Sequence, residues 1–93
     1  MTNFEKIKAF LLKKGFGVEE RKGKEGTVAV SSAVFSKGKN IITFEGRKDA
    51  NAFPYTLDVR IGESRIYHYR GKDAESALPP VFATSVIEQI KKL

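Results

Sequence analysis

Short glycine-containing turns separate the alternating segments in the middle of this chain, and they restrict its possible folds more than any other feature. Turns are predicted at residues 23–26, 37–39 and 62–63. Connections of this length join antiparallel neighbours, whereas parallel strands need crossovers of about a dozen residues or more. The sequence therefore predicts an antiparallel meander and argues against a parallel α/β sheet.

The segments between these turns alternate apolar and polar residues as half-buried strands do. In residues 55–61, Tyr, Leu, Val and Ile alternate with Thr, Asp and Arg, so one face is buried and the other is wet. The remaining strands are predicted at residues 16–21, 27–36, 40–46 and 65–70. The polar stretch 47–52 is expected to be a loop or one helical turn, and 71–78 a loop.

Two helices are predicted to flank these strands. Phe4, Ile7 and Leu11 have helical spacing, a Thr2/Glu5 pair has the spacing of a capping box, and Gly15 is a typical helix stop. The first helix is therefore predicted at residues 3–14. A second helix is expected to begin at residues 79–80, where two prolines need no amide partner. Its apolar stripe comprises Phe82, Val86, Ile90 and Leu93.

Together these elements predict an α+β fold: a four- to five-stranded antiparallel meander flanked in sequence by an N-terminal and a C-terminal helix. Two amphipathic helices suffice to cover one face of such a sheet, so we expect both on the same face and the other face open. Residues 1–93 are expected to form a single domain, with no repeats or internal linker.

Composition restricts the function. The chain has no cysteine, which excludes disulfides and thiolate chemistry and favours a reducing, cytoplasmic location. No apolar run approaches the ~18 residues of a membrane span, and no signal peptide is recognised. The formal charge is +6 and the pI near 9.7, which favours a nucleic-acid partner, DNA or RNA.

Lys14-Gly15-Phe16-Gly17 matches the first four positions of an RNA-recognition signature. Val18 and Arg21 stand where the signature needs its further aromatic residues, so the stretch is better interpreted as a helix stop followed by a core Phe. The helix–sheet–helix order is similar to that of double-stranded RNA-binding domains. However, Pro79-Pro80-Val81-Phe82 stands where that family has a basic cluster.

Candidate catalytic residues are few. His68 is the one histidine, and a metal site would need further ligands of its kind. In one strand register His68 would face Asp58, but no serine motif accompanies the pair. We therefore expect no catalysis, metal or cofactor.

The candidate binding strand is Arg65 to Arg70. With a two-residue turn at 62–63, Tyr67 and Tyr69 would lie on the open face beside Arg60 and Arg65; a three-residue turn would turn them inward and place His68 opposite Asp58. Glycine at the first turn position favours the short turn. Exposed phenol rings stack on bases, and arginines bind phosphates.

The leading hypothesis is a small, non-catalytic nucleic-acid-binding module that uses basic hairpin turns and an exposed Tyr/Arg sheet face. The alternative is a protein-interaction module, either a homodimer or a small inhibitor or adaptor of a larger partner. The predicted nucleic-acid contacts are Arg21, Lys22, Lys24, Lys37, Lys39, Arg47, Lys48, Arg60, Arg65, Tyr67 and Tyr69.

Overall fold

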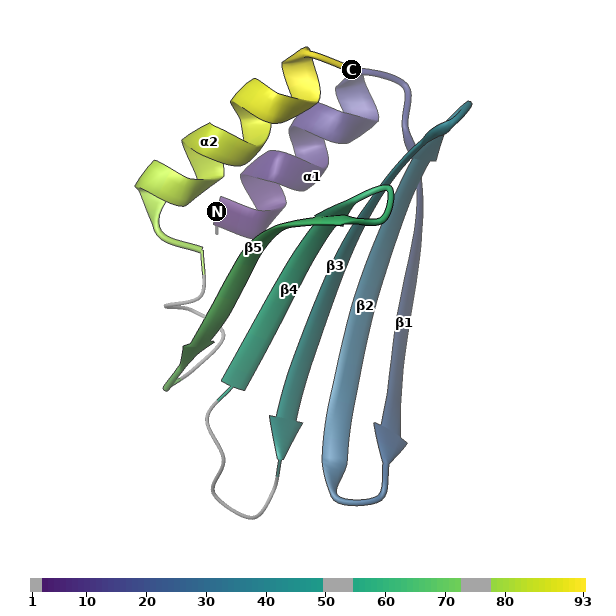
Figure 1. Cartoon of the computed structure of the whole chain (residues 1–93). Coiled ribbons are helices and arrows are strands. Elements are labelled where there is room, and N and C mark those ends of the chain that lie inside the picture. The colour runs from purple at the N-terminus through teal and green to yellow at the C-terminus, as the bar shows by residue number, and fades with distance from the viewer. Residues whose placement is uncertain (1–2, 50–54, 73–77) are drawn as a thin grey trace.

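The predicted fold class is confirmed: five antiparallel strands form one meander, preceded by one helix and followed by another (Figure 1). The computed structural model describes residues 3–49, 55–72 and 78–93. The strands lie in the sheet in sequence order, so each pairs with its neighbour in the chain. The elements are α1 (Asn3–Lys13), β1 (Gly17–Glu25), β2 (Val28–Lys37), β3 (Asn40–Asp49), β4 (Tyr55–Ile61), β5 (Ser64–Gly71) and α2 (Pro80–Lys91).

Helix α1 ends in a Schellman motif, as the glycine after it predicts. Gly15 has a positive φ of 96°, and its N–H donates to the Leu12 carbonyl at 3.0 Å. The Phe16 N–H donates to the Leu11 carbonyl at 3.0 Å, and the Phe16 side chain is buried. These bonds satisfy carbonyls that the helix leaves without partners. The RNA-recognition-like stretch is therefore a helix end.

Helix α2 begins at the predicted proline pair. Pro79 is its N-cap, Pro80 is its first residue, and the Pro79 carbonyl accepts hydrogen bonds from the Phe82 and Ala83 amides. A proline at this position has no amide to leave unpaired. Val86 and Ile90 lie fully buried on one side of the helix.

The core lies between the two helices and one face of the sheet. It takes Ile7 and Leu11 from α1 and Phe35, Ile42 and Val59 from the strands, all fully buried. The ring of Phe4 also contacts the rings of Phe35 and Phe44, with centroids 6.4 and 5.4 Å apart. Tilted and edge-to-face pairs of this kind are favourable beyond the area that they bury.

Strand β1 is longer than predicted. The first hairpin turn was predicted at residues 23–26, but residues 22–25 are paired with β2, and the turn follows Glu25. Gly26 has a φ of 62°, which glycine adopts at little cost. Strand β3 likewise continues to Asp49, so residues 47–49 are strand rather than the predicted loop or helical turn. In both strands, pairing with β2 extends an element whose own residues are too polar to indicate it.

The two-residue turn at 62–63 forms as predicted, with Ile61 opposite Ser64 and Arg60 opposite Arg65. A bulge then interrupts the pairing, and Tyr67 rather than Ile66 lies opposite Val59. One additional residue exchanges the faces of a strand. The bulge therefore decides the orientation of the rest of β5.

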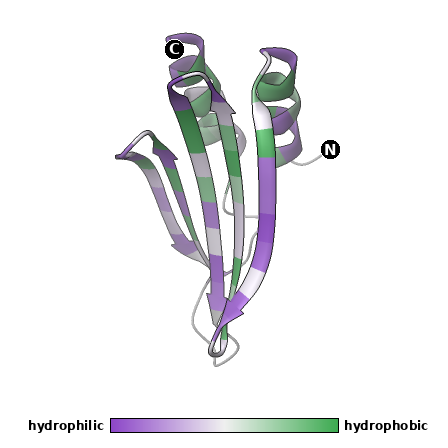
Figure 2. Cartoon of the chain, turned by 90° about the vertical axis from the view of Figure 1, so that its right-hand side faces the viewer, coloured by the Kyte–Doolittle hydropathy of each residue, from purple (hydrophilic) through white to green (hydrophobic). Residues whose placement is uncertain are grey.

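The helices run in the same direction and cover only part of the sheet (Figure 1). They lie over the half that ends at the β2–β3 turn, and the other half of the sheet extends beyond them. Strand β1 forms one edge and is hydrophilic along most of its length (Figure 2). Within residues 3–49, 55–72 and 78–93, no helix is long and apolar enough to cross a membrane.

Candidate nucleic-acid interface

Tyr67 and Tyr69 lie on the helix-facing side of the sheet. The prediction that they share an exposed face with Arg60 and Arg65 is therefore wrong. The tyrosines are paired with Val59 and Leu57, which are buried under the helices. Tyr67 stacks on Phe82 of α2 with an interplanar angle of 25°. Without the bulge, His68 and Arg70 would face the core instead. Partial burial of the two tyrosine rings and exposure of His68 and Arg70 favour the bulged register.

The side of the sheet without helices, here called the open face, carries arginines that are mostly paired with carboxylates. Arg21 lies 2.6 Å from Glu19, Arg47 lies 2.8 Å from Glu45, and Arg65 lies 3.5 Å from Asp58. Ion pairs this exposed contribute little to stability. They do neutralise much of the positive charge that the sequence assigned to this surface.

Two carboxylates oppose each other at the centre of the open face. Glu45 and Asp58 are direct cross-strand partners, an arrangement that is unfavourable for like charges. Arg47 balances Glu45, and its hydrogen bond and charge interaction with that carboxylate raise the Arg47 pKa. His68 lies 2.7 Å from Asp58. The open face is thus a nearly balanced network of charges.

A separate group of positive charges lies at the end of the molecule where both helices stop. We call this group the lysine end. It combines the last residues of α1, the β2–β3 turn and the last residues of α2 (Figure 1). Its members are Lys13, Lys14, Lys37, Lys39, Lys91 and Lys92.

A shallow depression of about 340 Å³ joins the three segments of the lysine end. Lys14, Lys37 and Lys39 line it, above an apolar floor that includes Phe16 and Ile90. The Lys37 ammonium donates a hydrogen bond of 2.6 Å to the Lys14 carbonyl at the end of α1. A cation here also complements the negative end of the helix dipole. The fold therefore holds these lysines close to one another despite their mutual repulsion.

The predicted contact residues are divided among three places. Lys37 and Lys39 belong to the lysine end, as the prediction of basic hairpin turns implies. By register, Lys22, Lys24 and Lys48 share the helix-facing side of the sheet, in the half beyond the helices. The predicted contacts on the open face are Arg21, Arg47, Arg60 and Arg65.

Sequence reasoning missed four members of the lysine end. Lys13, Lys14, Lys91 and Lys92 were not among the predicted contact residues. A signal was present, because both helices end in a Lys-Lys pair. Only the parallel orientation of the helices brings the two pairs to the same end of the molecule.

The described residues contain no group of three or more His, Cys, Asp or Glu side chains that could hold a metal ion. Ser32 lies in the same cross-strand row as His68, but Glu45 and Asp58 stand between them. Three strand spacings put this hydroxyl roughly 14 Å from the imidazole. His68 therefore cannot activate Ser32 directly.

The phenols of Tyr55 and Tyr67 have pKa values above that of free tyrosine. Burial raises the pKa of Tyr55, and burial followed by the nearby Tyr69 phenol raises that of Tyr67 above the usual value of 10. A raised folded pKa means that the associated stability is present below about pH 10 and is lost as the pH rises through the folded pKa.

We expect a titration followed at 295 nm to show part of the tyrosinate absorbance appearing above pH 10. In Tyr67→Phe one of these late-titrating groups should be missing. Protein unfolded in urea serves as the control, since all its tyrosines should titrate at the ordinary value. Identical curves for folded and unfolded protein would contradict the expectation.

In comparisons with known proteins, no family model, no curated protein and no solved structure matches this chain.

Proposed function

We propose that this chain binds nucleic acid without catalysis, and that the lysine end makes the main contacts to phosphates. The observation that carries the proposal is the convergence of three basic segments, far apart in sequence, at one end of the fold. The proposal retains Lys37 and Lys39 from the sequence prediction and adds the lysines at both helix ends. It assigns no stacking role to Tyr67 or Tyr69.

Charge supports the choice of this end. Seventeen basic residues stand against eleven acidic ones in the whole chain, so the six lysines equal the entire formal excess of +6. Glu88, which lies 3.4 Å from Lys91, offsets one of them. A concentrated positive surface attracts a phosphate backbone and releases its counterions on binding.

The chemistry of lysine supports backbone contacts rather than base recognition. An ammonium on a flexible stem is a point charge, whereas bidentate reading of base edges is typical of arginine. Within the described part of the chain, the side-chain ammonium groups of Lys39 and Lys92 have no hydrogen bond or ion pair. Their charges are therefore available to an external anion without breaking an internal contact.

The test is a binding titration with fluorescently labelled single- and double-stranded DNA and RNA at several salt concentrations. For duplex DNA, the logarithm of affinity should fall linearly with the logarithm of salt concentration, with a slope of about 0.9 per phosphate contact. The double variant Lys39→Gln/Lys92→Gln should lower that slope by roughly 2 and weaken binding to all sequences equally.

Matched variants make the test specific. Lys6→Gln/Lys72→Gln removes the same charge from exposed positions outside the lysine end and should keep the slope of the original protein. Lys24→Gln/Lys48→Gln tests two predicted contact residues that the structure places at the other end of the sheet. Absence of binding at low salt would overturn the proposal. So would a slope that falls in the Lys24/Lys48 variant but not in the Lys39/Lys92 variant.

A protein-interaction role is the second candidate, and the β1 edge favours it. All nine residues of this edge strand are exposed, so its outer backbone groups could pair with a strand of another chain. However, six of the nine are charged, a pattern that discourages edge pairing. Light scattering that gives a stable dimer, together with no binding of nucleic acid, would favour this candidate over the first.

A further inference from the structure

The half of the sheet that extends beyond the helices contains a cavity of about 690 Å³ on its helix-facing side. Phe4 from the start of α1 and Leu78 from the segment before α2 form one wall. Phe44 and Leu57 from the central strands contribute to the floor. The volume falls in the range of about 300–1,000 Å³ that is typical of small-molecule sites. This half-sheet cavity lies at the opposite end of both helices from the lysine end.

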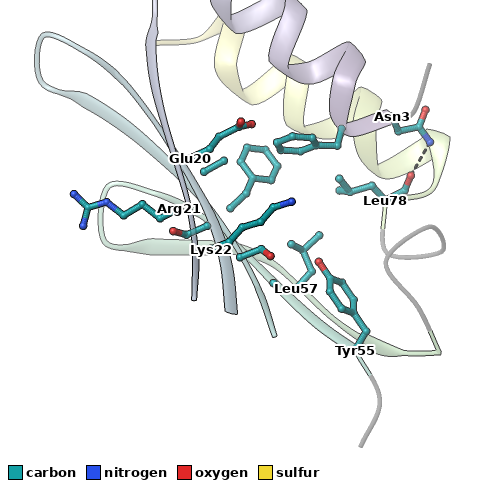
Figure 3. A pocket seen from close by; sticks show the side chains of 13 residues that line it. Asn3, Glu20, Arg21, Lys22, Tyr55, Leu57 and Leu78 are labelled. Atoms are coloured by element: carbon teal, nitrogen blue, oxygen red, sulfur yellow. Dashed lines mark hydrogen bonds between the residues drawn. The ribbon is translucent and has the colours of Figure 1, made fainter. Parts of the chain in front are cut away.

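The wall of the half-sheet cavity is tied together at the start of the helices. The Asn3 side-chain amide donates a hydrogen bond of 2.6 Å to the Leu78 carbonyl (Figure 3). This bond joins residues separated by 75 positions in the chain. The apolar wall is therefore fixed by the fold and does not depend on one segment alone.

Two polar groups point into the half-sheet cavity from different strands. Figure 3 shows the Lys22 ammonium reaching in from β1 and the Tyr55 hydroxyl from β4, whereas the Arg21 guanidinium points away. Neither group has a hydrogen-bond or ion-pair partner within the described part of the chain. Both are therefore free to bind a ligand.

The Tyr55 ring is held in place by close contact with Gly46 of β3. A Cβ atom at this glycine would overlap the Tyr55 hydroxyl, so only glycine allows the ring to lie against the strand. The Tyr55 phenol is a neutral hydrogen-bond donor at neutral pH, and burial raises its pKa further above the ordinary value of about 10. A fixed donor and a flexible cation thus share one largely apolar space.

The charges around the opening favour an anion. Lys24 and Lys48 share the face of Lys22 by register. Glu20 is the acidic residue that lines the half-sheet cavity among those described, and its carboxylate is bound by the Lys8 ammonium at 3.1 Å. An anionic group that reached Lys22 would therefore meet little repulsion.

We propose that the half-sheet cavity binds an amphipathic carboxylate, with an unbranched apolar body on Phe44 and Leu57 and the head group between Lys22 and Tyr55. The apolar surface supplies affinity by removing the hydrocarbon chain from water. The ammonium and the phenol select a carboxylate over an alcohol or a cation of the same length, because hydrogen bonds to a charged group are the stronger ones.

Isothermal titration with decanoate, decanol and decyltrimethylammonium tests this site. The intact protein should bind one decanoate at least about tenfold more tightly than either of the other two. Lys22→Met should weaken decanoate binding by about tenfold and leave decanol binding nearly unchanged. Tyr55→Phe should cause a smaller loss of the same kind, and Ser31→Trp, which adds a ring at the cavity wall, should abolish binding of both ligands.

Lys6→Met, an equal loss of charge at an exposed position outside the half-sheet cavity, should bind decanoate like the intact protein. Circular dichroism of each variant checks that it is folded. No binding of decanoate by the intact protein, equal affinity for the three ligands, or unchanged binding by folded Lys22→Met would each overturn the proposal. None of these outcomes bears on the lysine end, which the nucleic-acid titration tests separately.

Discussion

Phe35→Ala is expected to destabilise this protein by about 3–5 kcal/mol, the usual result of truncating a fully buried phenylalanine. Phe35 has no exposed surface and contacts the rings of Phe4 and Phe44, with centroids 6.4 and 5.8 Å away. The substitution removes the ring and leaves a cavity that strands β2 and β3 cannot close without breaking their pairing. Since a domain of this size has a stability of about 5–15 kcal/mol, the loss is a large fraction of the total.

Urea unfolding followed by circular dichroism measures the change for Phe35→Ala. Val18→Ala is the matched control, because Val18 is the cross-strand partner of Phe35 but is 37% exposed. It should change the free energy of unfolding by less than about 1 kcal/mol. Similar losses for the two variants would mean that Phe35 is not central to the core.

Val86→Asp should be equally damaging, by about 3–5 kcal/mol, because it places an uncompensated charge in the core. Val86 is fully buried at the centre of α2, on the side that faces the sheet. A carboxylate there must lose its hydration, become protonated, or draw α2 away from the sheet. The loss should shrink as the pH is lowered, since protonation removes the charge.

Ser85→Asp is the control for Val86→Asp. It introduces the same residue one position earlier in α2, at an exposed site, and should alter stability by no more than about 0.5 kcal/mol. Thermal unfolding at pH 7 and at pH 4 compares the two variants. A Val86→Asp protein as stable as the control would show that α2 contributes little to the fold.

Much of the fold could be predicted because each of its signals is local. Gly15 in the sequence indicates the Schellman end of α1, and the proline pair at 79–80 indicates the start of α2. The alternation of apolar and polar residues in β4 predicts which of its side chains are buried. By contrast, the far ends of β1 and β3 are strand only because β2 pairs with them, and pairing is not a property of one segment.

The candidate sites were harder to predict, because they depend on arrangement in space. Tyr67 and Tyr69 lie on the helix-facing side because of one bulge, and Tyr67 then stacks on Phe82 of α2. The lysine end forms because two helices stop at the same level beside a hairpin. The half-sheet cavity exists because neither helix is long enough to cover the whole sheet. No single sequence motif encodes the length of the helices relative to the strands.

The bulge in β5 inserts one more residue into β5 than into the facing stretch of β4. Which side chains of β5 face the helices depends on that residue. Loss of a single codon between the turn and Tyr67 would exchange the aromatic and the basic side chains between the two surfaces, with every contact residue still encoded. Related chains could therefore differ in the chemistry of both surfaces while their sequences remain almost identical. Comparisons of such chains should start from the spacing between Gly62 and Tyr67 before they consider the residues themselves.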